Sequence, residues 1–356
     1  MSQVPFRIGV MQLTMEPLEQ ILAHARAMDR HGFDTIWLAE AYPWWRKHQM
    51  EARSSTAVSA LIARETERLS VGWGIISPYT RHPIQVAMEA RVTQEAAGNG
   101  RFRLGFGASK IFMKEIGVGD GRPARPRTAI REAMEIVRAV LEGRAVDFEG
   151  REFSAHVPAL SDEAESPRWP VPLYVAGTGP KMQELAGEAG DGLLTPSITT
   201  PAFVRYASGN VAVGARRAGR DPEQIDIGCT IVASIDDDPA KGREGAREIA
   251  GMYLANKVQN IQASADTLLE CADLGQDEIR PIAEAMEGGG RRAAAVAVSD
   301  EILDKCKPIG GTPAQCIERI EEYREAGCTH IMLELWGEDR DRQIELFGEK
   351  VLPHFR

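Results

Sequence analysis

Residues 71–83 read VGWGIISPYTRHP, an apolar strand pattern that breaks abruptly into turn residues. Apolar residues continue to Ile76, and Ser77-Pro78 then ends the strand, because proline has no backbone N–H to donate to a sheet. A second proline, Pro83, stands directly before a helical pattern. In a parallel barrel, a strand that ends in a compact loop of polar side chains lies at the face that carries the chemistry.

Strand and helix patterns alternate on both sides of this segment. Apolar residues at helical spacing predict a helix over 18–31, which Gly32 ends in the usual C-terminal position. Further helices are expected over 55–66, 84–97, 126–142, 180–189, 201–218, 239–258, 264–274, 312–326 and 341–351. Strands are expected over 6–11, 34–39, 71–76, 101–107, 171–176, 191–194, 225–234 and 330–335. Eight strand–helix repeats predict an α/β fold of the (β/α)8 TIM-barrel type rather than a doubly wound sheet.

Two segments do not fit the repeat, and we expect both to be insertions in a single domain that spans residues 1–356. The first, about 146–170, begins with a short hairpin over 146–153 and continues as a polar loop. The second, about 259–307, contains the run Gly288-Gly289-Gly290-Arg291-Arg292, which is typical of a mobile segment. This second insertion either covers the mouth of the barrel or is a tolerated surface excursion.

Composition and charge exclude several classes of protein. The chain has 356 residues, of which 43% are hydrophobic and 26% charged, as is typical of a soluble globular protein. A formal net charge of −10 argues against a protein that binds nucleic acid or an anionic membrane. This charge is compatible with a local basic pocket for a phosphorylated ligand, and the expected partner is a small-molecule substrate.

The cysteines, the apolar segments and residues 1–6 indicate the cellular compartment in which the protein is expected. Five cysteines show no metal-ligand spacing, so we expect reduced thiols and no metal site. No segment approaches the ~20 apolar residues that span a bilayer, and residues 1–6 lack the pattern of a signal peptide. A cytoplasmic protein without a membrane anchor is expected.

Residues that follow the other strands are candidates for chemistry. Glu40 follows the second strand, where a carboxylate serves as an acid, a base or an acceptor for a heterocyclic N–H. An ion pair of Glu40 with Arg46 or Lys47 is the structural alternative. The bulky pair Trp44-Trp45 is expected to place one ring in the hydrophobic shell and the other against a substrate pocket. The last strand ends at Glu334-Leu335-Trp336.

Gly177-Thr178-Gly179-Pro180-Lys181 is the clearest candidate for an anion site. Two glycines let the backbone approach a ligand closely, and Pro180 stands at the first position of a helix, where its missing N–H costs nothing. The free N–H groups of that helix then point at an anion, with the Thr178 hydroxyl and Lys181 nearby. A plain glycine turn is the structural alternative.

Four segments resemble the luciferase-like monooxygenase superfamily, and within it the branch that uses coenzyme F420, a deazaflavin. They are residues 72–83, 101–107, 174–182 and 311–313. The first is specific to the F420-dependent branch, typified by methylenetetrahydromethanopterin reductase. The resemblance covers nearly the whole chain and implies a luciferase-like TIM barrel, F420 as cofactor and, since family members are often homodimers, a homodimer.

The resemblance implies where the deazaflavin ring binds. A bulge of the third strand would carry a non-prolyl cis peptide bond, Gly74-Ile75, behind the ring. Contacts to the ring and the ribityl chain would fall near Ser77, Gly107 and Ser109. Phosphate contacts would fall on Gly177, Thr178 and Gly179. The acidic tail of the coenzyme would require cations, for which the candidates are Lys110, Lys114 and Lys181.

Departures from the family bear on the reaction. Glucose-6-phosphate dehydrogenases of the family use a His and a Glu as base and proton donor, but Ala41 and Lys110 stand at those positions. The catalytic candidates are Glu40, Trp44 and Lys110, the last as a stabiliser of developing negative charge. Hydride transfer to an electrophilic carbon in a C=N or C=C bond is favoured, because such a carbon needs less help from an acid.

The resulting hypothesis is an F420-dependent oxidoreductase that moves a hydride between the deazaflavin and an organic substrate at the barrel mouth. The first alternative is an FMN-dependent monooxygenase that uses reduced flavin and O2. The second alternative is a barrel that binds a cofactor without catalysis.

Overall fold

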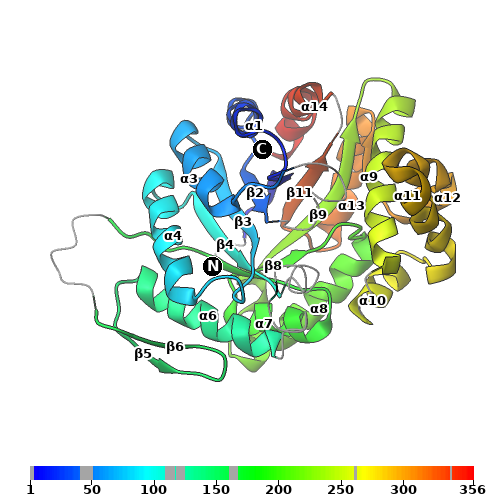
Figure 1. Cartoon of the computed structure of the whole chain (residues 1–356). Helices are drawn as coiled ribbons and strands as arrows, with labels where there is room; N and C mark the ends of the chain where they lie inside the picture. Colours follow the sequence, from blue (N-terminus) through cyan, green and yellow to red (C-terminus); the bar gives the residue numbers. More distant parts are fainter. Residues whose placement is uncertain are drawn as a thin grey trace.

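Parallel strands close into a barrel in the computed structural model, which describes residues 4–40, 51–108, 117, 125–159, 167–259, 263–336 and 339–356. The barrel strands are β1 (Arg7–Leu13), β2 (Thr35–Ala39), β3 (Ser70–Ile76), β4 (Phe102–Phe106), β7 (Leu173–Ala176), β8 (Gly192–Thr195), β9 (Asp226–Ile235) and β11 (His330–Leu335). They pair in the order β9-β11-β1-β2-β3-β4-β7-β8, and pairing of β8 with β9 closes the ring. The predicted (β/α)8 barrel is confirmed (Figure 1).

Helices surround the strands on the outside of the barrel (Figure 1). They are α1 (Leu18–His31), α3 (Ser55–Glu65), α4 (Pro83–Ala97), α6 (Pro126–Leu141), α7 (Pro180–Ala189), α8 (Pro201–Arg217), α9 (Pro239–Gln259), α13 (Pro313–Glu325) and α14 (Arg340–Leu346). Beyond the end of β8, a short strand, β10 (Ile309–Gly311), pairs with the last residues of β9. In the described part of the chain, no helix combines the length and apolar character needed to cross a bilayer.

The first insertion contains a hairpin that differs from the prediction. Its strands are β5 (Val146–Glu149) and β6 (Ser154–Val157), so the hairpin ends later than residue 153. The Glu132 carboxylate on α6 accepts the backbone N–H groups of Arg151, Glu152 and Phe153 at 2.8 to 3.0 Å. This long-range contact fixes a four-residue turn, 150–153, that local sequence signals do not reveal.

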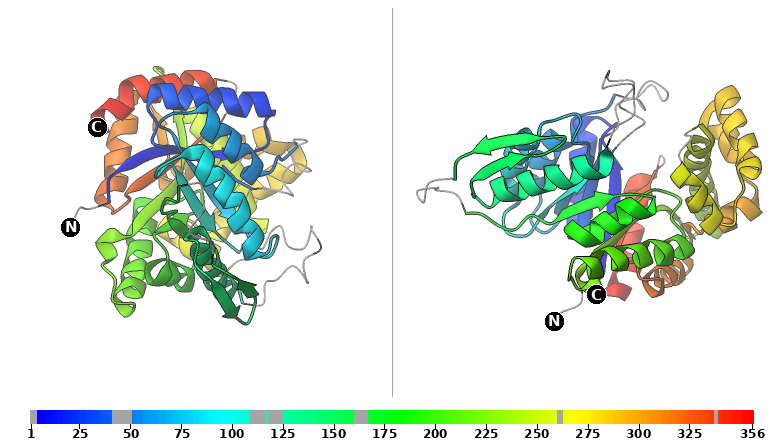
Figure 2. Two further views of the ribbon diagram at one scale, coloured as in Figure 1. Left: turned by 90° about the vertical axis from the view of Figure 1, so that its left-hand side faces the viewer. Right: turned by 90° about the horizontal axis from the view of Figure 1, so that it is seen from below.

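The second insertion is helical. It contains α10 (Ala263–Cys271), α11 (Gln276–Ala297) and α12 (Asp300–Lys305). The glycine run that predicted a mobile segment is part of α11 instead, and the helix bends at Gly290, where φ is 70°. The three helices stand to one side of the barrel, and the β5–β6 hairpin lies on the opposite side (Figure 2).

Side chains alternate between two apolar regions along each strand. On β11, Ile331, Leu333 and Leu335 pack into the large core between the strands and the helices. Met332 points the other way, into a small cluster inside the barrel. This alternation follows from the two-residue period of a strand, and it makes every second residue of each strand a lining residue of the barrel interior.

A polar cluster fills the interior at the N-terminal ends of the strands. Asp226, which is 4% exposed, accepts hydrogen bonds from the Tyr174 hydroxyl at 2.6 Å and the Thr329 hydroxyl at 2.5 Å. Its carboxylate also lies 3.2 Å from Nδ1 of His330 and 3.3 Å from the Arg7 guanidinium. Burial alone would raise the pKa of Asp226, but these partners outweigh burial and lower it.

The ring of His330 joins this cluster to two other strands. Its Nε2 lies 2.7 Å from the Thr35 hydroxyl and accepts the Trp37 indole N–H at 3.3 Å. Burial lowers the pKa of His330, which keeps the ring neutral. The cluster therefore ties β2, β7, β9 and β11 together with buried hydrogen bonds around one carboxylate.

Replacement of Asp226 by Asn is expected to lower the free energy of unfolding by about 3–5 kcal/mol, because it removes the anion that compensates the buried partners. Asp237→Asn is the matched control, since the Asp237 side chain is 54% exposed and pairs with Lys350 and Arg342 in solvent. Chemical denaturation measures both variants. Equal midpoints for Asp226→Asn and the wild type would contradict the assigned role.

Candidate functional site

An apolar floor lies inside the barrel toward the C-terminal ends of the strands. It is formed by the buried side chains of Met11, Trp37, Tyr174, Leu194 and Met332. Three partly exposed side chains, those of Ala39, Ile75 and Ala176, pack on this cluster. A flat apolar group could rest on this floor, because the side chains that cap it are small or aliphatic.

The third strand is irregular at the floor, as the resemblance implies. Its pairing with β4 shifts register between Trp73 and Ile76, and the Gly74-Ile75 peptide bond is cis. Gly107 lies beside this bulge, and a Cβ at position 107 would stand 2.8 Å from Cδ1 of Ile75. Because Gly107 has no Cβ, the Ile75 side chain can occupy this space.

The loop after the bulge is closed by its own hydrogen bonds. Ser77 is 4% exposed, its hydroxyl accepts the backbone N–H of Tyr79 at 3.4 Å, and its carbonyl accepts the Thr80 hydroxyl at 2.9 Å. The N–H of Gly107 donates to the carbonyl of Ile76 at 3.1 Å. The structure therefore brings the predicted residues of β3 and β4 together at one place.

The loop before α7 presents open backbone donors. The N–H of Gly177 donates to the Leu194 carbonyl at 3.2 Å, whereas those of Thr178, Gly179 and Lys181 have no acceptor among the described residues. Three N–H groups at a helix N-terminus form a binding site for an anion. The anion site at this loop stays a prediction, with a plain glycine turn as its structural alternative.

Two further contacts hold this loop in place. The buried Gln183 side chain donates to the Thr178 carbonyl at 2.9 Å and is itself held by Asn210 at 2.8 Å. A Cβ at Gly177 would stand 2.3 Å from Cβ of Met182, so only glycine fits. The Lys181 side chain is exposed beside the loop.

Glu40 is held by a cation from the neighbouring strand end. The two nitrogens Nη1 and Nη2 of Arg81 contact its carboxylate at 2.8 and 2.7 Å, and the Glu40 side chain is 7% exposed. Arg81 also lies 3.4 Å from Glu89 on α4. The partners expected for Glu40, Arg46 and Lys47, lie outside the described residues, as do Trp44, Ser109, Lys110 and Lys114.

Glu334 at the end of β11 was named as part of a strand end but was not among the predicted site residues. It is 2% exposed, and its Oε1 accepts the Tyr253 hydroxyl at 2.5 Å and the Ser197 hydroxyl at 3.0 Å. Its Oε2 is buried and has no hydrogen-bond partner among the described residues. The residue can be found from sequence by counting inward positions along β11, because His330, Met332 and Glu334 share one face.

The pKa of the Glu334 carboxyl group is unusual. Burial raises the pKa of Glu334 to about 7, and the hydrogen bonds from Tyr253 and Ser197 and the charge of Lys257 only partly oppose this rise. Lys257 is half-buried on α9, and burial lowers its pKa to about 8. A carboxyl group that titrates near neutral pH is suited to proton transfer.

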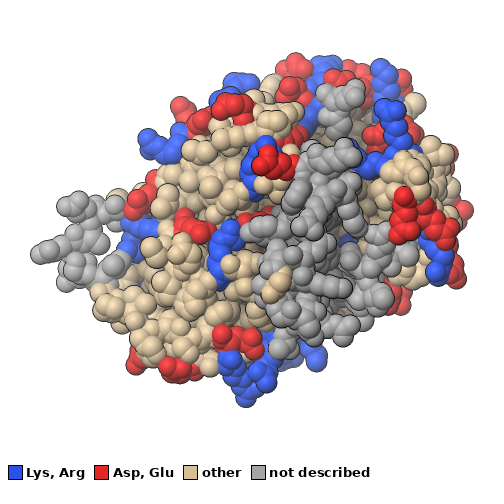
Figure 3. Space-filling view, viewed as in Figure 1, with Lys and Arg blue, Asp and Glu red and all other residues tan. Residues whose placement is uncertain are grey.

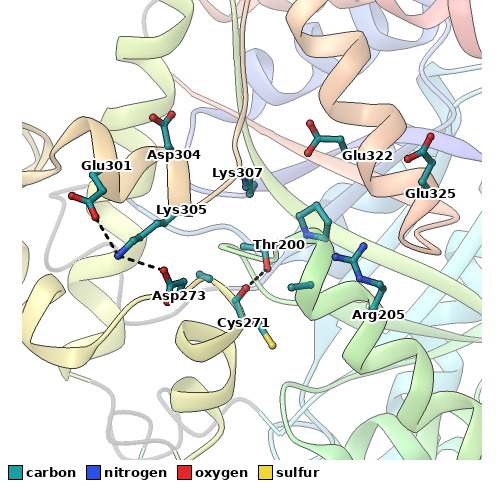
Figure 4. A pocket seen from close by; sticks show the side chains of 13 residues that line it. Thr200, Arg205, Cys271, Asp273, Glu301, Asp304, Lys305, Lys307, Glu322 and Glu325 are labelled. Carbon is teal, nitrogen blue, oxygen red and sulfur yellow. Dashed lines mark hydrogen bonds and ion pairs between the residues drawn. The ribbon is translucent and has the colours of Figure 1, made fainter.

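A cleft of about 800 Å³ lies outside the barrel, between α8, α10, α12 and α13 (Figure 4). Its charges largely neutralise one another: Lys305 lies 3.5 Å from Glu301 and 3.8 Å from Asp273. On the face shown in Figure 3, acidic and basic side chains are likewise intermixed around the edge. We place the candidate site at the barrel mouth, where the strand ends converge.

Comparisons with known proteins identify the family of the chain. The chain matches the luciferase-like monooxygenase family over residues 1–330. It is 30% identical to the 5,10-methylenetetrahydromethanopterin reductase of Archaeoglobus fulgidus, over 94% of this chain and 95% of that protein. It is 28% identical to the F420-dependent glucose-6-phosphate dehydrogenase of Nocardia farcinica, over 92% of this chain and 91% of that protein.

A solved structure is similar to the chain as well. The coenzyme F420 dependent tetrahydromethanopterin reductase from Methanopyrus kandleri matches with a TM-score of 0.85 and 26% identity, over 99% of this chain and 100% of that chain. The resemblance carried by residues 72–83 and the three other segments is thereby confirmed. The chain belongs to the luciferase-like monooxygenase family.

Proposed function

We propose that this protein is an F420-dependent oxidoreductase, which transfers a hydride between the deazaflavin and an organic substrate at the barrel mouth. Similarity over nearly the full length, in sequence and in fold, to enzymes named as F420-dependent is the observation that carries this proposal. The bound deazaflavin supplies the carbon that donates or accepts the hydride. The protein orients it and excludes water.

The described residues fit such a cofactor. The loop 177–181 offers open backbone N–H groups to a phosphate, and the floor at Ile75, Ala39 and Ala176 offers an apolar surface to a planar ring. Gly74 and Gly107 keep side chains off this surface. Ser109, Lys110 and Trp44 remain predicted contacts.

Two departures from the family support a choice of substrate class. Ala41 and Lys110 stand where the glucose-6-phosphate dehydrogenases of the family carry a His and a Glu, so we favour reduction of a C=N or C=C bond. Glu40 is best explained as a positioning group, because its bidentate contact with Arg81 satisfies both carboxylate oxygens.

Cofactor titration tests the proposal. The purified apoprotein is expected to bind F420 and to quench its fluorescence, and to bind FMN more weakly. Tight binding of FMN without binding of F420 would favour the FMN-dependent monooxygenase. Binding of either cofactor without turnover of any C=N, C=C or carbonyl substrate would favour the non-catalytic barrel.

Thr178→Asp tests the position of the phosphate. A negative charge at the N-terminus of α7 is expected to repel the phosphate and to weaken F420 binding at least tenfold, or about 1.4 kcal/mol. Thr178→Asn is the matched control, because it has nearly the same shape without the charge. Equal F420 affinities of the two variants in a fluorescence titration would move the phosphate elsewhere.

We also infer that the protein forms a homodimer through α3 and α4. The two helices pack on each other, and they expose Leu61, Met88 and Val92 by 43%, 59% and 59%. Large apolar side chains grouped on a surface are typical of an interface.

Light scattering is expected to give twice the 39.0 kDa chain mass, and Met88→Lys is expected to give the monomer. Val213→Lys on α8, where Val213 is 45% exposed, is the control that keeps the dimer.

A further inference from the structure

The position of Glu334 follows from the alternation of β11. His330 lies in the polar cluster at the bottom of the barrel, and Met332 belongs to the apolar floor above it. Glu334 is the next inward-facing residue, and β11 ends one residue later. Its carboxyl group therefore lies at the mouth, at the same end of the barrel as the Ile75 bulge and the α7 loop.

The two carboxyl oxygens of Glu334 have different surroundings. Ser197 follows β8 and Tyr253 lies on α9, and their hydroxyl groups both donate to Oε1. Oε2 is buried but has no partner within the described residues. Buried polar atoms are nearly always hydrogen-bonded in native proteins, so an orphan oxygen at a strand end indicates a missing ligand.

Few titratable groups face this carboxyl group. In the described part of the chain they are Lys257 and the Tyr253 phenol, both on α9. His330, on the same strand, is neutral and engaged with Asp226. Burial therefore dominates, and the raised pKa of about 7 leaves much of Glu334 protonated at neutral pH.

We propose that Glu334 is the proton donor of the F420-dependent reaction inferred above, and that Oε2 hands its proton to a neutral unsaturated substrate. In the reduction, a substrate carbon gains a hydride from the reduced deazaflavin, which is oxidised. The Oε2–H bond breaks, and its proton bonds to the atom at the other end of the substrate double bond. Glu334 is left as a carboxylate, which water reprotonates.

This assignment distinguishes between the two favoured bond types, C=N and C=C. Reduction of an iminium ion needs no proton, because the hydride alone neutralises the C=N⁺ group. Reduction of a neutral conjugated C=C bond needs one proton for each hydride, and Glu334 supplies it. Lys257 favours the carboxylate that remains, while Tyr253 and Ser197 are positioning residues that keep Oε1 occupied and Oε2 free.

Glu334→Gln tests the proposal, because it keeps the shape of the side chain and an oxygen for the two hydroxyl donors, but removes the acidic proton. Glu188→Gln is the matched control, since Glu188 is a partly buried carboxylate that pairs with Arg127 and Arg131 outside the barrel. The first measurement uses the cofactor-free protein. Infrared difference spectroscopy is expected to show a carboxyl band that ionises near pH 7 in the wild type and the control, and not in Glu334→Gln.

The second measurement uses F420 and a neutral conjugated C=C substrate. Turnover of the wild type is expected to fall as the pH rises through about 7, because the donor loses its proton. Turnover of Glu334→Gln is expected to be about 10²–10⁴-fold lower and to lack this pH dependence. Its affinity for F420 is expected to stay within about threefold of the wild type.

The outcomes separate this inference from the proposed function. Two results would overturn the inference alone. In one, Glu334→Gln binds F420 normally and its turnover is unchanged. In the other, the infrared band of the wild type ionises in the ordinary carboxyl range. Failure of the wild type to bind F420 overturns the proposed function and the inference with it. If Glu334→Gln does not fold, Tyr253→Phe replaces it: loss of its hydrogen bond must move the pH dependence upward, and an unmoved profile overturns the inference.

Discussion

Backbone hydrogen bonds between β8 and β9 close the sheet into a ring, and the arrangement of the interior depends on this closure. Once the sheet is closed, every second side chain of each strand must point inward. The polar cluster around Asp226, the apolar floor around Trp37 and the mouth at Glu334 are successive layers of these inward residues. The register of the strands thus determines at which level of the barrel each of these side chains lies.

The two glutamates at the mouth, Glu40 and Glu334, differ in their chemical role because their surroundings differ. Glu40 is held by the guanidinium of Arg81 from the next strand end, so its charge is compensated. Glu334 has hydroxyl donors on one oxygen and no partner on the other within the described structure. At Glu334 the effect of burial on the pKa outweighs that of Tyr253, Ser197 and Lys257. The two carboxyl groups are therefore suited to different tasks.

Much of the barrel is visible in the sequence because its signals are local. The break after Ile76, the glycine after α1 and the Gly177–Lys181 loop each depend on a few adjacent residues, and the structure has them where they were expected. The hairpin turn and the partner of Glu40 were missed, because each depends on contacts between distant residues. Glu132 fixes the turn from 19 residues away, and Arg81 reaches Glu40 across 41.

The sequence placed Glu334 at a strand end, but its role was not predicted, for a related reason. Its place at a strand end is local information, but its burial and the donors Tyr253 and Ser197 come from α9 and from the loop after β8. The helical state of the glycine run in α11 also depends on contacts between distant residues. The glycine run predicts mobility when considered alone, whereas packing of α11 against α9 keeps it helical on both sides of Gly290.

The buried carboxyl group of Glu334 also makes the stability of the native fold depend on pH. In the unfolded chain Glu334 ionises near pH 4.5, and in the native protein near pH 7, so the native state holds the extra proton between these values. Stability from this group is present in full below pH 4.5 and is lost as the pH rises through 7, by roughly 3 kcal/mol. The native fold is thus weakened by its own active-site acid as the pH approaches neutrality, and a ligand that hydrogen-bonds to Oε2 would restore part of that stability.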